Sequence, residues 1–198
     1  MEFPIFPLNG AVLYPGTSLP LNIFEDRYIE MINYSLSINR QIGMIQSDEN
    51  NNLFKIGCLG KIQNFNETND GRYLISLQGI NCFRIQKELE VKYKFRMVEA
   101  ELIDTYVEDE NIFSQNDKLT LLEKYRKYTK IKKINLDLEE IEKIELSQII
   151  KFIAMVSPFK DIEKQALLET TSFEDLYNKI DSIIELEIMG QNSNLTIN

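Results

Sequence analysis

The feature that most constrains the fold of this chain is a change in the spacing of its apolar residues near residue 107. Before that point, apolar side chains come in short runs separated by turn-forming residues; beyond it, they recur every three or four residues. Strands repeat every two residues and helices every 3.6. The pattern therefore predicts a β-rich domain over 1–107 and a helical subdomain over 108–190. Residues 191–198 lack periodicity and are expected to be a flexible tail.

Turn signals divide the first part of the chain into short elements. Pro15-Gly16 predicts a turn, and Asp70-Gly71 between two apolar runs predicts a tight β-hairpin. Gly79 lies inside an apolar run, which predicts a β-bulge that bends the strand. Strands are expected over 4–8, 19–23, 41–46, 54–65, 73–85 and 93–103, and the prolines favour an edge or irregular position for the first strand.

Two kinds of helix are expected. An amphipathic helix over 24–36 would bury Phe24, Tyr28, Ile32 and Leu36, which recur every four residues. The second part of the chain predicts about four helices, over 112–128, 138–156, 161–169, and from Ser172 to about 189. Together, these patterns predict an α+β fold in which mostly antiparallel strands form a small closed or half-closed barrel with one helix, followed by a C-terminal α-helical bundle.

Composition excludes several classes of function. The 198 residues contain no histidine, which excludes Ser-His-Asp catalysis and histidine-based zinc sites. Two cysteines are too few for a four-thiolate zinc site, so we expect no metal and no cofactor. The net charge of −9 opposes nucleic acid binding. The start Met1-Glu2-Phe3-Pro4 is unlike a signal peptide and no apolar run reaches membrane-spanning length, so we expect a cytoplasmic protein without a membrane partner.

Few residues point to specific chemistry. Glu25 and Arg27 would be either a ligand-binding pair or an ion pair that fixes a helix to neighbouring loops. If Asp70-Gly71 is a two-residue loop, Cys58 faces Phe83; a shifted register would instead make Cys58 and Cys82 close neighbours. In a reducing cytoplasm the two thiols are most simply small buried groups, with a redox or metal role as the alternative. Dense carboxylates such as Glu108-Asp109-Glu110 read as solvated surface.

The remaining signal is an excess of apolar residues among prolines near the N-terminus. They would either form an exposed groove for a protein partner or an extended peptide, or pack the floor of the barrel. These residues are Phe3, Phe6, Leu13, Tyr14 and Phe24.

The same region resembles the start of the Lon protease N-terminal domain. That family opens with a P-L-x-x-x-V-x-F-P-G-like phrase, followed by P-L-x-I-F-E-x-R-Y and a helix. The segments 56–62, 70–85 and 163–169 are similar to later parts of the family, although Cys82 stands where the family pattern has an arginine. The residues of the opening phrases that match are Pro7, Leu8, Pro15, Gly16, Pro20, Leu21, Phe24, Glu25, Arg27 and Tyr28.

The resemblance implies a PUA-like twisted antiparallel β-barrel or sheet followed by a helical bundle. It also implies a non-enzymatic, bacterial substrate-recognition module, because this sequence has neither the ATPase domain nor the Ser-Lys protease domain of full-length Lon. Such a module would bind exposed apolar segments of unfolded polypeptides, or a protein partner in proteolysis or quality control. The candidate binding residues are Phe6, Leu13, Tyr14, Phe24 and Tyr28. The family-motif residues with structural roles are Pro7, Pro15, Gly16, Pro20, Glu25, Arg27, Gly57 and Gly79.

Two other functions are consistent with the fold class. PUA-like barrels include RNA-binding proteins, but the acidic charge and the lack of a basic, aromatic strand face argue against that role. An enzyme with a carboxylate-only or Ser/Lys site would need clustered, buried polar residues at the barrel mouth, which the sequence does not indicate. The pattern leaves the oligomeric state open.

Overall fold

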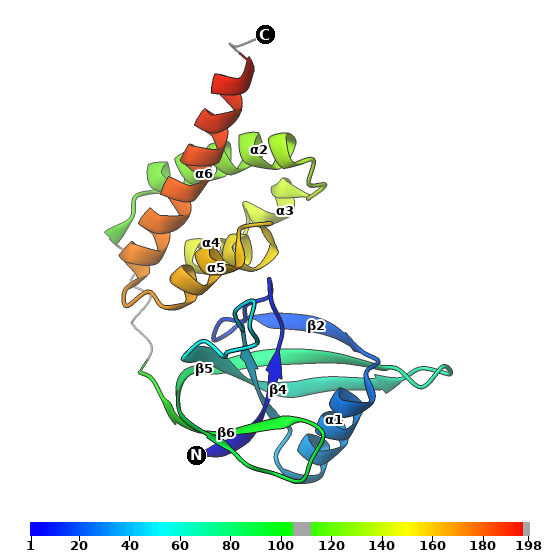
Figure 1. Cartoon of the computed structure of the whole chain (residues 1–198). Coiled ribbons are helices and arrows are strands. Elements are labelled where there is room, and N and C mark those ends of the chain that lie inside the picture. Colours follow the sequence, from blue (N-terminus) through cyan, green and yellow to red (C-terminus); the bar gives the residue numbers. More distant parts are fainter. Residues whose placement is uncertain (105–111, 196–198) are drawn as a thin grey trace. The chain divides into compact units, whose positions relative to one another are not determined.

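A computed structural model describes residues 1–104 and 112–195, with side chains through residue 190. The described residues form two compact units (Figure 1). The β-rich unit contains residues 1–104 and 157–169, and the helical unit contains residues 112–156 and 170–195. The domain boundary expected at residue 107 lies outside the described residues. The α+β fold class predicted from the sequence is confirmed.

Five strands of the β-rich unit close into a barrel. Following the paired neighbours, the ring runs from β1 to β3, β4, β5 and β6 and returns to β1, while β2 pairs with the first half of β5. The predicted barrel is therefore present. The strands are β1 (Glu2–Pro7), β2 (Ser18–Ile23), β3 (Gln41–Ile45), β4 (Ile56–Glu67), β5 (Tyr73–Leu89) and β6 (Arg96–Leu102).

Strand β1 lies between β3 and β6, so of the two expected positions, edge or irregular, the edge position is wrong. Its two ladders occupy different halves of the strand: residues 2–5 pair with β6 and residues 5–7 pair with β3. Pro4 therefore pairs with β6 only and Pro7 with β3 only. Because each proline has a neighbouring strand on one side alone, its missing N–H group disrupts few ladder hydrogen bonds, and both prolines are tolerated in an interior strand. The β1–β3 pair is parallel, and the intervening β2 and helix supply the long crossover that a parallel pair requires.

The hairpin between β4 and β5 is longer than the sequence predicts. Glu67 pairs with Tyr73, so residues 68–72 form the loop, in which Gly71 has a φ of +81°. The expectation of a two-residue loop is therefore wrong, and Cys58 faces Cys82 instead of Phe83. The predicted bulge is confirmed, because the register shifts between the pairs Leu59–Asn81 and Gly60–Gly79.

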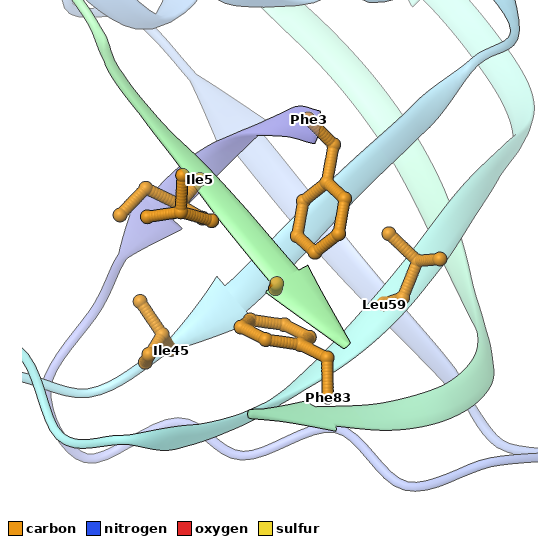
Figure 2. Packing of buried hydrophobic residues seen from close by; sticks show 7 residues of the cluster. Phe3, Ile5, Ile45, Leu59 and Phe83 are labelled. Carbon is orange, nitrogen blue, oxygen red and sulfur yellow. The ribbon is translucent and has the colours of Figure 1, made fainter. Parts of the chain in front are cut away.

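The core of the barrel is a cluster of aromatic and aliphatic side chains (Figure 2). At its centre the rings of Phe3 and Phe83 meet edge to face, with centroids 4.9 Å apart. A Cβ atom on Gly43 or Gly57 would lie under 3 Å from the Phe83 ring, so both positions need glycine for this ring to fit. The family-motif residue Gly57 therefore has a packing role. The cluster contains Phe3, Ile5, Ile45, Leu59, Phe83, Val98 and Ala100.

Helix α1 (Asp26–Ile38) begins two residues later than its apolar pattern predicts. Glu25 is the N-cap residue, so Phe24 precedes the helix and does not share its buried face. The helix buries Tyr28, Met31, Ile32 and Ser35 against the barrel. This offset of the helix start leaves the ring of Phe24 64% exposed.

Helix α5 (Asp161–Leu168) is part of the β-rich unit, although the sequence placed it in the helical subdomain over 108–190. A buried pair of amides explains the difference. The Nε2 group of Gln46 donates to Oε1 of Gln165 at 3.1 Å and to the carbonyl oxygen of Asp161 at 3.1 Å. Gln165 in turn donates to the carbonyl oxygen of Ile56 at 3.0 Å. These long-range hydrogen bonds attach α5 to β3 and β4.

The helical unit contains α2 (Gln115–Lys132), α3 (Leu138–Ile141), α4 (Leu146–Val156) and α6 (Phe173–Leu195). The helix expected over 138–156 is split in two, with residues 142–145 between α3 and α4. In this break the Ile144 carbonyl accepts a hydrogen bond from Lys118 Nζ at 2.7 Å. The expected cap is confirmed: Asp175 N–H donates to Ser172 Oγ at 3.0 Å. Helix α6 runs to Leu195, so residues 191–195 of the expected tail are helical, and residues 196–198 lie outside the described residues.

Lys124 of α2 binds α6 by donating hydrogen bonds to both carboxylate oxygens of Asp181, at 2.8 and 2.9 Å.

Within the described ranges, none of the helices combines the length and apolar character needed to cross a bilayer.

Candidate functional site

An apolar cleft of about 310 Å³ opens on the β-rich unit beside the start of α1. Its lining comes from the end of β1 and the residue after it, from β2, and from the segment that leads into the first turn of α1. We call it the apolar cleft. Its lining residues are Phe6, Pro7, Leu8, Pro20, Leu21, Asn22, Ile23, Phe24, Glu25, Arg27 and Tyr28.

The aromatic residues of the apolar cleft have different exposures. Phe6 and Tyr28 are buried and meet edge to face, with ring centroids 4.4 Å apart. Phe24 stands at the rim with most of its surface in solvent. Burial raises the pKa of the Tyr28 hydroxyl above its usual value, and the nearby guanidinium of Arg27 opposes that shift. The cleft thus has a fixed aromatic floor and one exposed aromatic side chain.

Glu25 and Arg27 form the ion pair that the sequence suggested, and both line the cleft. The Arg27 guanidinium donates from Nε to Glu25 Oε2 at 2.9 Å and lies over the Tyr28 ring, 4.4 Å from its centroid. Both side chains are about half exposed, so the pair adds little to the stability of the fold. The pair is local to the start of the helix, since its two residues are two positions apart, and both residues line the cleft.

Leu13 and Tyr14 are not part of this surface. Their side chains are 0% and 3% exposed, so the expectation that they form an exposed binding groove is wrong. The reason is a close approach of the backbone: a Cβ atom on Gly79 would collide with the Tyr14 carbonyl group. The proline-rich segment therefore contributes Leu13 and Tyr14 to the interior, while Phe6, Phe24 and Tyr28 come together at the cleft.

The family-motif residues have separate positions. Pro7 and Pro20 line the apolar cleft. Pro15 and Gly16 form a turn in which Thr17 N–H donates to the Tyr14 carbonyl at 3.1 Å and Gly16 has a φ of +79°. This turn lies against the Gly79 bulge, since Gly16 N–H donates to the Gly79 carbonyl at 3.0 Å.

A second, larger cleft of about 570 Å³ shares a wall with the first. We call it the cationic cleft, because its lining includes three cationic side chains. The sequence analysis singled out Arg27 but neither Lys94 nor Arg96. The alternation of basic and aromatic residues over 92–96 is the signal that would have found two of them. The lining residues are Pro7, Leu8, Asn9, Arg27, Tyr28, Ser47, Asn51, Lys94, Phe95 and Arg96.

Hydrogen bonds fix the shape of the cationic cleft. Arg96 donates to both carboxylate oxygens of Glu88, at 2.6 and 2.7 Å, and to the carbonyl oxygen of Asn51 at 3.2 Å. The pairing lowers the pKa of the Glu88 carboxyl and raises that of Arg96. On the other side, Ser47 donates from its backbone N–H and its hydroxyl to Asn9 Oδ1, at 2.9 and 3.0 Å.

The two clefts present surfaces suited to binding a ligand. Within residues 1–104 and 112–195, no group of three or more carboxylate or thiol side chains is placed to hold a metal ion. The apolar cleft presents aromatic, aliphatic and proline surfaces, which suit contact with apolar side chains. The adjoining cations suit contact with anionic groups.

Known proteins are similar to this chain over nearly its whole length. The family described as the ATP-dependent protease La (LON) substrate-binding domain matches residues 2–185. Lon protease of Buchnera aphidicola subsp. Baizongia pistaciae is 28% identical over 197 residues, covering 95% of this chain and 25% of the relative. Lon protease of Escherichia coli K12 is 22% identical over 197 residues, with the same two coverages. This chain therefore spans about a quarter of the length of the curated relatives that it matches.

Solved structures show the same fold. The N-terminal domain of the Mycobacterium avium complex Lon protease superposes with a TM-score of 0.71 at 12% identity, over 93% of this chain and 98% of that one. The Lon N-terminal domain protein from Xanthomonas campestris gives a TM-score of 0.66 at 18% identity, with the same coverages. Because the family match covers nearly all of the sequence, this chain belongs to the LON substrate-binding domain family.

Proposed function

We propose that the β-rich unit binds exposed apolar segments of unfolded polypeptides in the apolar cleft, and that this chain acts by recognition without catalysing a reaction. The observation that carries the proposal is Phe24, which is 64% exposed at the rim of a cleft that already has an aromatic floor. A large apolar side chain left in water beside an apolar cleft is typical of an interaction site.

The family supports this assignment. Its description names a substrate-binding domain, and the relatives are proteases whose substrates are proteins. The match is confined to about a quarter of each relative, and that quarter is the part described as substrate-binding. The proposal therefore concerns capture of a polypeptide in proteolysis or quality control, in the cytoplasm.

The geometry suggests how an apolar segment would bind. The floor formed by Phe6 and Tyr28 is packed before any ligand arrives, so little conformational entropy is lost there on binding. Pro20 adds a rigid apolar surface on β2. Covering the exposed ring of Phe24 with a partner side chain would contribute on the order of 1–2 kcal/mol. Such a site binds weakly and accepts many sequences, as recognition of unfolded chains requires.

Fluorescence anisotropy with a labelled peptide tests the proposal. The peptide carries two aromatic residues among serine and glutamine, is acetylated and amidated, and has no charged side chain. The full chain is expected to bind it, and Phe24→Ser is expected to weaken binding about tenfold, because the rim loses its large apolar surface.

The matched control is Ile38→Ser. Ile38 is 61% exposed at the far end of α1 and does not line either cleft, so this substitution removes a similar exposed apolar surface elsewhere. It is expected to leave the affinity unchanged. Equal affinities of Phe24→Ser and the wild-type chain, or no binding by the wild-type chain at high micromolar concentration, would overturn the proposal.

A further inference from the structure

The two clefts lie next to each other. They share Pro7, Leu8, Arg27 and Tyr28, so a chain that places an apolar side chain in one cleft brings its neighbouring residues to the other. The two clefts differ in chemistry: the first is lined mainly by apolar residues, and the second by cationic and polar ones.

The side chains that line the cationic cleft carry positive charge and no negative charge. Its lining residues include Arg27, Lys94 and Arg96 but no carboxylate. Arg27 is paired with Glu25, and Arg96 is paired with Glu88, so these two cations are largely neutralised by partners outside the lining. Within the part of the chain that the structure describes, Lys94 forms no hydrogen bond or ion pair, so its ammonium group is the cation available to a ligand.

The position of Lys94 is set by its aromatic neighbours. The Tyr93 and Phe95 rings are parallel, with centroids 4.8 Å apart, and both rings contact Tyr34 of α1. Phe95 is buried, so the backbone at Lys94 is held against the helix that also carries Arg27. A long exposed lysine side chain thus starts from a fixed backbone at the wall of the cleft.

We propose that the cationic cleft binds the carboxylate side chains of an acidic segment that adjoins an apolar residue seated in the apolar cleft. This inference rests on the proposed function, because it assigns the composition of the polypeptide that the same surface takes. The positive charge of Lys94 in a lining without carboxylates is complementary to such a segment. The chain as a whole has a net charge of −9, which repels acidic peptides. A preference for acidic peptides would therefore have to come from the local charge of the cationic cleft.

Two labelled peptides with the same aromatic residues test the inference by fluorescence anisotropy. Both are acetylated and amidated; one has glutamates flanking the aromatic pair, and the other has glutamines. The wild-type chain is expected to bind the glutamate peptide about two- to fivefold more tightly at low salt, as for an exposed ion pair, and to lose the preference as salt screens the charges.

Lys94→Gln is expected to remove most of the preference for glutamate while leaving the affinity for the glutamine peptide unchanged. Lys61→Gln is the matched control, since Lys61 is exposed on β4 and does not line either cleft. It should keep the preference. A third peptide, with glutamines and a free C-terminal carboxylate, tests for capture of a chain end.

Each outcome separates the two proposals. If the glutamine peptide binds and the glutamate peptide binds no better, the inference fails while the proposed function stands. If only the peptide with a free C-terminus gains affinity, the ligand is a chain end and the acidic segment is excluded. If no peptide binds, the proposed function fails and the inference fails with it. A preference for glutamate that Lys94→Gln does not reduce also overturns the assignment of the cationic cleft.

Discussion

Gly16 and Gly79, far apart in the sequence, are joined by a backbone hydrogen bond of 3.0 Å from the Gly16 N–H to the Gly79 carbonyl. The Gly79 N–H donates in return to the Thr17 carbonyl at 2.9 Å. These hydrogen bonds hold the turn at Pro15-Gly16 against the bulge of β5, which lies between the part of β5 that pairs with β2 and the part that pairs with β6. Two of the family-motif glycines therefore form one structural unit.

Gly79→Ala is expected to destabilise the β-rich unit by about 1–3 kcal/mol, because the added methyl group would collide with the Tyr14 carbonyl. A backbone group cannot rotate away as a flexible side chain would, so the turn or the strand must shift. Urea unfolding, together with hydrogen exchange of the β5 amides, measures the loss.

Gly190→Ala is the control for replacing a glycine. Nothing lies within 4 Å of a Cβ atom at this helical position. We expect a gain of about 0.5–1 kcal/mol in the free energy of unfolding, since alanine favours a helix. Equal stabilities of the two variants would show that the approach of Tyr14 to Gly79 does not constrain the fold.

Gln165→Leu tests the attachment of α5 to the strands. The substitution leaves the Ile56 carbonyl without the hydrogen bond it accepts from Gln165 at 3.0 Å. It also removes one of the two acceptors of the buried Gln46 Nε2 group, whose other acceptor is the Asp161 carbonyl. The expected loss is about 1–3 kcal/mol in urea unfolding. Gln63→Leu, on an exposed position of β4, is expected to change stability by less than about 0.5 kcal/mol. A loss of the same size at both positions would contradict the role of the buried amides.

The local elements of this fold follow from patterns within short segments. The turn at Pro15-Gly16, the bulge at Gly79 and the Ser172 cap were predicted, because glycine, proline and serine act through their own backbone geometry or hydrogen bonds. The central place of β1 and the attachment of α5 were not predicted. They depend on the offset ladders of β1 and on the pairing of Gln46 with Gln165, which are set by residues distant in the sequence.

The candidate site shows the same division. Phe6, Phe24 and Tyr28 were predicted and meet at the cleft, whereas Leu13 and Tyr14 have the same apolar character but are buried. Apolar residues among prolines do not reveal their own exposure, since that depends on whether another backbone covers them. Lys94 and Arg96 were missed because the cationic cleft is assembled from separate segments, with β1, the start of α1 and the 92–96 segment each supplying part of it.

The Lys124–Asp181 pair is expected to couple α2 and α6 by about 0.5–1 kcal/mol, as measured by a double-mutant cycle of Lys124→Met and Asp181→Asn. Both side chains are roughly one quarter exposed, and hydrogen bonding to Asp181 raises the pKa of Lys124. About 1 M salt should weaken the coupling. The more exposed i,i+4 pair of Lys179 with Asp175 is the control, with an expected coupling of about 0.3–0.5 kcal/mol. Equal coupling energies for the two pairs would contradict a stronger interaction between Lys124 and Asp181 than between Lys179 and Asp175.

The buried ammonium group of Lys164 is expected to make the free energy of unfolding depend on pH. It is buried in α5 and donates from Nζ to the Gly10 carbonyl at 2.8 Å, and burial lowers its pKa below the usual value. Between the lowered pKa of the folded state and about 10.4 for the unfolded chain, the unfolded state binds more protons. The contribution of Lys164 to stability should therefore increase as pH rises through that window, and it is least favourable below both pKa values.

Lys164→Met removes this titration. In urea unfolding from about pH 7 to about pH 10, the free energy of unfolding of the wild-type chain is expected to rise relative to that of Lys164→Met. Gln63→Leu adds and removes no titrating group, so its curve should run parallel to the wild-type curve. If the difference between wild type and Lys164→Met stays constant across the range, the buried ammonium carries no desolvation cost.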